Sequence, residues 1–216
     1  FDIQYKGQKR QMIEVLRGRY NRDMDFKDTV DLAASLCLDE YFCGKYPDCP
    51  MMKTKVTRKN MAENVRQAFD YFAGRKTQTA TLMLQSFGVL DGDKIRPEGS
   101  KYAAYYIDQL KQLPPQGVIN YSDIFNVKYD DQYEDKHFNI NYLFTPIIFL
   151  SMVYAGYATM TLRNGTVLSA SNLDTVPRIG VLDLYEFKYL ARPAQMAMAE
   201  LKKLFDVLEI NPVLLD

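Results

Sequence analysis

The sequence predicts a mainly α-helical fold with one small β-hairpin, arranged as a helical bundle joined to a winged-helix-like module. Apolar residues recur at three- and four-residue spacing through most of the chain, which is typical of amphipathic helices. Residues 141–171 read differently, as one uncharged, largely apolar segment followed by two short strands joined at Asn164-Gly165. Because a helix that runs into a hairpin is the second half of a winged helix, this segment provides the main architectural evidence.

The composition is that of a globular protein without a strong overall charge. The chain has 216 residues, of which 47% are apolar and 25% charged, and its formal net charge is zero. Such a chain can bury a sizeable core, and binding to nucleic acid or acidic lipid would need a local basic patch. The longest uncharged stretch, residues 138–162, is interrupted by polar residues and a proline. A bilayer span needs about 20 mainly apolar residues, so no membrane segment is expected.

Cysteine usage and the two ends of the chain suggest a piece of an intracellular protein. Cys37, Cys43 and Cys49 are odd in number and nothing else marks the chain as secreted, so the cytoplasm is the expected location. The chain starts at Phe1 without a signal peptide and ends on the apolar residues 213–215, so we expect it to be part of a longer protein. The cysteines lack the two- to four-residue spacing of paired zinc ligands, and no metal site is expected.

Helical periodicity and its breaks divide the chain into three parts. Residues 1–76 are predicted to form a helical N-terminal subdomain, residues 77–171 a winged-helix-like subdomain, and residues 172–216 a truncated C-terminal pair of helices. The predicted helices outside the middle part cover residues 5–20, 25–44 (capped by Asp25 or Asp28), 57–74, 182–191 and 194–208, with a linker at 174–178. The apolar face predicted for helix 25–44 consists of Val30, Ala33, Ala34, Cys37 and Tyr41.

The order of elements predicted for residues 100–170 is that of a winged helix. They are a helix capped by Ser100, an extended piece at 117–120, a short helix at 122–125, an acidic loop at 130–136, the long helix 141–155 and two strands. The turn between the strands is predicted from Asn164-Gly165, because this dipeptide favours a two-residue turn in which both central residues have positive φ.

The long helix of this module is a poor candidate for reading DNA. Reading helices present Arg, Lys, Asn or Gln to bases and phosphates, whereas helix 141–155 has no charged residue and carries apolar residues around most of its circumference. This pattern predicts burial. Positive charge gathers instead at residues 6–22 and 53–59, and at the tip of the hairpin. Possible nucleic-acid contacts are Lys9, Arg10, Arg17, Arg19, Lys53, Lys55, Arg58, Lys59 and Arg163. They either form solvated faces or contact phosphates without sequence preference.

No catalytic motif is visible in the sequence. His137 follows an acidic stretch and could act with it as an acid–base pair or metal site, but acidic loops are usually only solvated. Residues 74–77, Gly-Arg-Lys-Thr, lack the glycines that a phosphate-binding loop requires. Tyr102, Tyr105 and Tyr106 fit a helix that contributes to the core. We therefore expect no catalytic residue, no cofactor and no bound small-molecule substrate.

Several segments resemble a region of the large P-loop ATPases found in bacterial phage-exclusion loci, the BREX and phage-growth-limitation systems. They are TRKNMAENVRQAFDYFAGRKTQ, LQSFGVLDGDKIRPEGSKYAAYYIDQL and VLDLYEFKYLARP, and VDLAASLCLDEYF followed by YPDCP fits the same pattern. The resemblance implies an intracellular protein in a multi-protein complex that restricts phage DNA replication. The family's nucleotide-binding loop has no counterpart here, so no functional residue is carried over.

The leading functional hypothesis is a non-catalytic interaction or scaffold domain of such an ATPase. Its partners would be other domains of the parent protein and proteins of the defence complex. The alternative is a module that binds nucleic acid non-specifically through the faces at 6–22 and 53–59, with DNA as its partner. A metal-dependent enzyme built on His137 is a third, weaker hypothesis.

Overall fold

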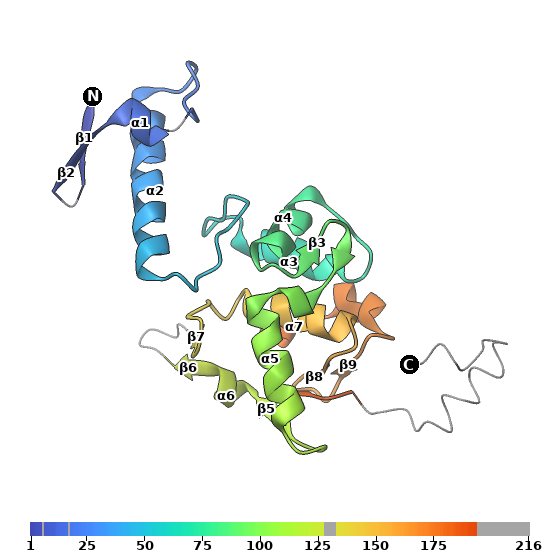
Figure 1. The fold of residues 1–216 in the computed structure, drawn as a ribbon. Coiled ribbons are helices and arrows are strands. Elements are labelled where there is room, and N and C mark those ends of the chain that lie inside the picture. The colour runs from blue at the N-terminus through green and yellow to red at the C-terminus, as the bar shows by residue number, and fades with distance from the viewer. Residues whose placement is uncertain (6, 17, 128–132, 194–216) are drawn as a thin grey trace. The chain divides into compact units, whose positions relative to one another are not determined.

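The fold combines helices with small antiparallel sheets and is therefore mixed α/β rather than mainly α with a single hairpin. The computed structural model describes residues 1–5, 7–16, 18–127 and 133–193 (Figure 1). Contacts divide the chain into two compact units. Unit 1 is Phe1–Met51 with Phe138–Ile140, and unit 2 is Met52–His137 with the described part of Asn141–Asp216.

Unit 1 begins with a hairpin, which corrects the helix predicted over residues 5–20. Strand β1 (Asp2–Tyr5) pairs antiparallel with β2 (Gln8–Gln11), and the helix α1 (Met12–Leu16) is short. Gly7, between the strands, has φ +76°, a conformation that glycine adopts at little cost and that suits a tight hairpin turn. The helical spacing of Met12, Ile13 and Leu16 was therefore extended too far toward the N-terminus.

Helix α2 (Phe26–Lys45) confirms the predicted second helix. The Asp25 side chain accepts a hydrogen bond from the Asp28 backbone N–H at 2.7 Å, which satisfies one of the free donors of the first turn. The buried side of α2 packs with α1, and the small core of unit 1 consists of Val15, Leu16, Ala33 and Cys37. The predicted apolar face is only partly right, because Val30 and Ala34 are exposed.

The core of unit 2 is built from four helices (Figure 1), one of which, α7 (Thr145–Tyr154), is almost entirely buried. The other three are α3 (Met61–Tyr71), α4 (Gln78–Ser86) and α5 (Lys101–Gln112), with α3 packing on α4 and both α3 and α5 packing on α7. Thr77 and Ser100 cap α4 and α5 by accepting backbone N–H bonds. Although α3 falls within the predicted subdomain 1–76, it packs in the unit that starts at Met52.

A four-stranded antiparallel sheet closes unit 2. Its strands are β5 (Val118–Asn120), β10 (Tyr189–Ala191), β8 (Thr159–Thr161) and β9 (Val167–Leu168), in that spatial order. The register aligns Ile119, Leu190, Met160 and Leu168 across the sheet. All four side chains are buried, so one face of the sheet contributes a continuous apolar row to the core.

Strand β10 corrects the helix predicted over residues 182–191. Helix α8 (Val181–Tyr185) ends early, and the chain then extends to pair with β5 on one side and β8 on the other. The buried position of Leu190 in the sheet outweighs the local helical pattern. The predicted helix 194–208 lies outside the described residues.

The hairpin of β8 and β9 exists, but its turn differs from the predicted one. Leu162 N–H donates to Thr166 O at 2.8 Å and Gly165 N–H donates to Leu162 O at 3.0 Å, which encloses a three-residue loop. Gly165 has φ +87°, whereas Asn164 is not among the residues with positive φ. This is the arrangement of a turn followed by one left-handed residue, and the two-residue turn prediction is wrong.

Short elements complete unit 2. They are β3 (Leu90–Asp91), β4 (Lys94–Ile95), η1 (Pro97–Gly99), α6 (Tyr121–Ile124), β6 (Phe125–Val127), β7 (Tyr133–Asp135) and η3 (Leu173–Arg178). Strands β6 and β7 pair, so part of the predicted acidic loop is a strand. The predicted linker 174–178 lies within η3, a 3-10 helix.

Candidate functional site

Helix α7 has no surface with which to enter a DNA groove. All its residues from Thr145 to Val153 are buried, and only Tyr154 at its end is exposed. The prediction that this uncharged helix packs inside the domain is confirmed. Contact with a nucleic acid or protein must therefore use other parts of the chain.

Of the basic residues at 6–22 that the structure describes, Lys9 and Arg10 lie on strand β2, and Arg19 and Arg22 follow α1. Lys9 forms an ion pair with Asp2 at 2.8 Å, and Arg10 forms one with Glu40 at 3.0 Å. Arg19 is exposed beyond α1, and Arg17 lies outside the described residues. The two ion pairs offset part of the positive charge that the sequence places here.

The basic residues at 53–59 lie on an ordered turn of unit 2. The Lys53 backbone N–H donates to Ser86 Oγ at 2.8 Å, and the Lys55 carbonyl accepts from Asn60 Nδ2 at 3.0 Å. The four cationic side chains that the turn exposes are Lys53, Lys55, Arg58 and Lys59. Within the described parts of the chain, none of the four takes part in an ion pair. We call them the basic turn.

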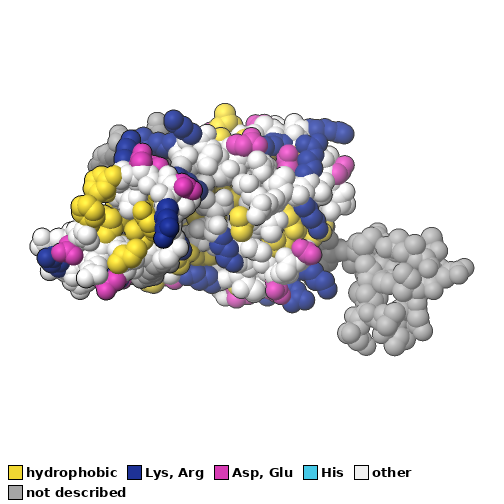
Figure 2. Space-filling view, turned by 90° about the horizontal axis from the view of Figure 1, so that it is seen from above, with side chains coloured by type: hydrophobic (Ala, Val, Ile, Leu, Met, Phe, Trp, Pro, Cys, Tyr) yellow, Lys and Arg dark blue, Asp and Glu magenta, His cyan; other side chains and the backbone are white. Residues whose placement is uncertain are grey.

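Arg163 lies apart from the basic turn in the sequence, in the loop between β8 and β9. Its Nη1 is 3.5 Å from a carboxylate oxygen of Glu186, and its guanidinium lies 6.0 Å from the centroid of the Tyr121 ring. In the view of Figure 2, Lys and Arg side chains are interspersed with Asp and Glu, and hydrophobic side chains are also exposed. The charge on that face forms no single basic field.

Among the described residues, the candidate metal and acid–base side chains form no metal-binding group. Cys37, Cys43 and Cys49 form no disulfide within the part of the chain that the structure describes. Within the described residues, no three His, Cys, Asp or Glu side chains are grouped so that they could hold a metal ion. The imidazole of His137 stacks on the Tyr105 ring, with centroids 4.1 Å apart and planes 5° from parallel. Its ring therefore packs against α5.

An exposed apolar row along α2 is a feature that the sequence reasoning missed. Its members follow a spacing of four or eight residues, and each is between 37% (Val30) and 64% (Phe26) exposed. The row, which we call the α2 row, consists of Phe26, Val30, Leu38, Phe42 and Tyr46. Residues four apart form a ridge on a helix. The spacing was visible in the sequence, but Val30 was assigned to the buried face.

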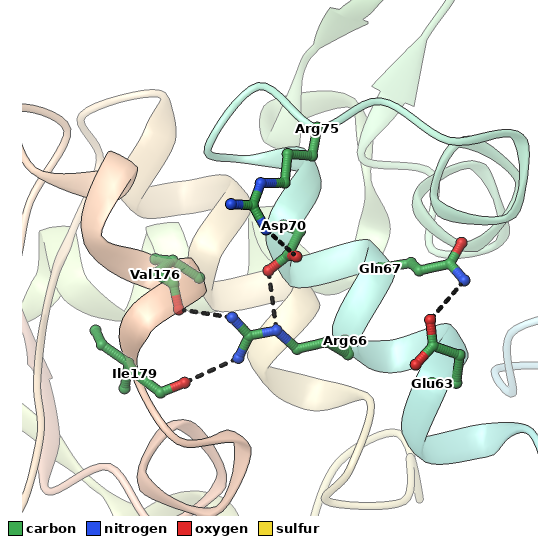
Figure 3. A network of polar contacts seen from close by, with 7 residues as sticks. All are labelled: Glu63, Arg66, Gln67, Asp70, Arg75, Val176 and Ile179. Carbon is green, nitrogen blue, oxygen red and sulfur yellow. Dashed lines mark hydrogen bonds and ion pairs between the residues drawn. The ribbon is translucent and has the colours of Figure 1, made fainter.

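Arg66 links α3 to the end of η3 through two of its guanidinium nitrogens, while the third lies beside Asp70 of the same helix (Figure 3). Nη1 donates to Ile179 O at 2.8 Å and Nη2 to Val176 O at 3.1 Å, while Nε lies 2.9 Å from Asp70 Oδ1. Arg75 approaches the other oxygen of Asp70 at 3.3 Å. This network satisfies the carbonyls at the end of η3 and fixes that segment on α3. It is a structural site.

Among the helices that the structure describes, none has the length and apolar character required of a membrane span.

The chain belongs to a family of unknown function, described as the fourth domain of DUF6079. The family match covers residues 61–192, from the first residue of α3 to the residue after β10. No curated protein and no solved structure matches the chain. The family therefore corresponds to the helical core and sheet of unit 2.

Proposed function

We propose that this chain is a non-catalytic interaction domain of a large bacterial phage-defence P-loop ATPase of the BREX or phage-growth-limitation type. Its partners are other domains of the parent protein or proteins of the defence complex. The observation that carries the interaction role is the α2 row. The sequence resemblance supports the link to phage defence, and the description of the family as a fourth domain supports a parent protein with several domains.

The α2 row is a surface that favours a protein partner. Exposed apolar side chains that gather on one surface mark interaction sites, and Leu38 and Phe42, one turn apart on α2 and each about half exposed, form the middle of the row. Unit 1 has only four buried residues in its core cluster, and a unit of about 50 residues is of marginal stability by itself. A helical partner could place its own ridges beside Val30 and Leu38, in the commonest mode of helix packing. Such packing would stabilise unit 1.

We also propose that unit 2 is a winged-helix-like module whose central helix has become core. The order α5, β5, α6, α7, β8, β9 follows the pattern of that fold, with the paired strands β6 and β7 inserted between α6 and α7. Two departures separate it from a DNA reader. Strand β10 lies between β5 and the hairpin, and α7 is buried.

The test is a double substitution in the α2 row of the full-length protein, Leu38→Glu with Phe42→Glu. We expect loss of co-purifying partners and of phage restriction, because two carboxylates would have to be buried at the contact. Since both side chains are exposed, the isolated chain should melt at an unchanged temperature. Asp93→Lys, an exposed charge change in unit 2 and outside α2, is the matched control. An intact complex in the double variant would contradict the proposal. Micromolar ATP binding by the isolated chain in calorimetry would contradict its non-catalytic part.

A second candidate function, non-specific nucleic-acid binding, is favoured by the basic turn. Its side chains are exposed on a fixed backbone and lack ion pairs within the described residues. Four phosphate contacts would make the affinity fall steeply with salt. A gel shift with duplex DNA at low salt should then be weakened by Lys55→Glu and, in the other basic segment at 6–22, by Arg17→Glu. An unshifted band at low salt would remove this candidate.

A further inference from the structure

A cavity of about 410 Å³ lies in unit 2, where the end of α5 meets the end of β10. Its walls are mainly apolar, with Ile107 and Leu110 from α5 and Tyr157 from the segment after α7. Two cationic residues, Lys111 and Arg192, also line it. The volume lies within the range of small-ligand pockets, roughly 300–1,000 Å³.

Arg192 is held at this cavity in a way that leaves hydrogen-bonding capacity unused. Its Nη2 donates to Leu113 O at 2.7 Å, which fixes the guanidinium at the C-terminal end of α5. Its Nε is buried and has no acceptor within the described residues, and a ligand reaches it only if the groups that close it off from solvent move aside. Arg66 differs, because both of its Nη atoms donate to backbone carbonyls and its Nε lies 2.9 Å from Asp70 Oδ1. A buried donor on a charged group is costly to leave unsatisfied.

The charges around the cavity favour a singly charged anion. Arg192 forms no ion pair with a carboxylate of the described residues, and Lys111 pairs only with the exposed Asp108 at 3.3 Å. The C-terminal end of α5 contributes a partial negative charge of about half a unit. The positive charges of Lys111 and Arg192 outweigh this partial charge, and the negative charge of Asp108 offsets most of what remains. The mainly apolar walls further favour a ligand whose charge is confined to one end.

We propose that this cavity binds an apolar carboxylate, which is a role beyond the interaction function proposed above. The planar guanidinium of arginine matches a carboxylate with two parallel hydrogen bonds. The ligand's hydrocarbon or aromatic part lies against Ile107, Leu110 and Tyr157, and Lys111 adds attraction at the rim. The carboxylate belongs either to a small organic acid or to the C-terminus of a peptide that ends in an apolar residue.

The experiment is an NMR titration of the whole chain with matched charged and uncharged probes. Phenylacetate is compared with phenylacetamide, and N-acetyl-glycyl-phenylalanine with its C-terminal amide. We expect the Arg192 Nε–H signal and the Ile107 methyl signals to shift on adding a carboxylate, with each amide bound at least about tenfold more weakly. Stronger binding of phenylacetate identifies a small acid as the ligand class, and stronger binding of the peptide acid identifies a chain terminus.

Two variants keep the test decisive. Arg192→Gln should abolish the difference between acid and amide, provided that its melting temperature shows a folded chain. Lys111→Glu changes a side chain that is 64% exposed, so it should fold normally and weaken carboxylate binding several-fold without affecting the amides. Equal binding of acid and amide, no binding of any probe at about 10 mM, or an unchanged acid affinity in Lys111→Glu would overturn the proposal.

Discussion

Ile148 is the side chain on which the account of unit 2 depends most. It is fully buried in α7, and its neighbours Ile147 and Phe149 are fully buried as well. Their burial on successive faces means that α7 is enclosed by protein on all sides. The absence of charged residues in 141–155 was enough to predict this from the sequence, because a helix that is apolar all round is stable only when it is buried.

Replacing Ile148 with aspartate should unfold unit 2. An unpaired carboxylate in this position costs several kcal/mol, which is a large fraction of the total stability of a domain. Arg163→Ala, at an exposed position, should change the free energy of unfolding by no more than about 0.5 kcal/mol. Thermal melts followed by circular dichroism measure both. A normal melt of Ile148→Asp would show that α7 is accessible and would restore the DNA-reading hypothesis.

The burial of Tyr185 makes the stability of unit 2 depend on pH. Its ring contacts Phe69 and Tyr142 edge-on, with centroids 6.0 and 5.8 Å away. Burial, and to a smaller degree the charge of Tyr142, raises the pKa of Tyr185 from 10.0 to about 12. Between these values the folded state keeps a proton that the unfolded state has lost. The stabilising contribution is therefore complete below about pH 10 and is lost as the pH rises toward 12.

The free energy of unfolding should accordingly decline between pH 10 and pH 12. In the Tyr185→Phe variant, the free energy of unfolding should decline less steeply over the same range. Urea unfolding at a series of alkaline pH values gives both slopes. In an ultraviolet titration of the folded protein, the same variant should lack one late-titrating tyrosine. Identical slopes for the two proteins would show that Tyr185 is accessible to solvent.

At the scale of elements, local capping signals predicted helices well, and pairing between distant strands could not be predicted. Asp25 and Ser100 act as the caps that the sequence suggested. Strand β10 was missed because its helical spacing is overruled by β5 and β8, which bind it from both sides. The N-terminal hairpin was missed because the apolar spacing of α1 was extended across Gly7.

Arg66 holds η3 against α3, and its removal should destabilise unit 2. We expect Arg66→Met to cost about 2 kcal/mol, because two backbone carbonyls lose a charged donor while the apolar stem is retained. Arg75→Met removes a side chain that is 67% exposed and should cost at most about 0.5 kcal/mol. Urea unfolding of both variants measures the difference. Equal costs would mean that η3 is held mainly by its apolar contacts.

Gly165 tests the turn of the β8–β9 hairpin. With φ +87°, alanine at this position should cost about 1 kcal/mol. Asn164 accepts a hydrogen bond from the Thr166 N–H at 2.9 Å, so Asn164→Asp preserves the acceptor and should be nearly neutral. Thermal melts compare the two. A neutral Gly165→Ala would be inconsistent with a left-handed residue at this position.

For the whole molecule, the chemistry of single residues could be predicted, but the surfaces that they form could not. The cationic residues 53–59 were evident in the sequence, whereas their fixed turn depends on Ser86 and Asn60. The cavity beside Arg192 is lined by residues of α5 and by residues after β10, which are far apart in the sequence. No local sequence pattern therefore predicts it. The α2 row was present as a spacing, but only the packing of Ala33 and Cys37 on α1 shows which side of α2 remains exposed.

The interaction role of the α2 row can be measured directly by site-specific photo-crosslinking in the full-length protein within its host. A benzophenone amino acid replaces Leu38 in one strain and Asp93, an exposed polar position in unit 2, in another. Mass spectrometry identifies the adducts. We predict that position 38 crosslinks strongly to another domain of the parent protein or to a subunit of the defence complex, and position 93 much less. Equal labelling at the two positions, or no adduct at position 38, would contradict the account.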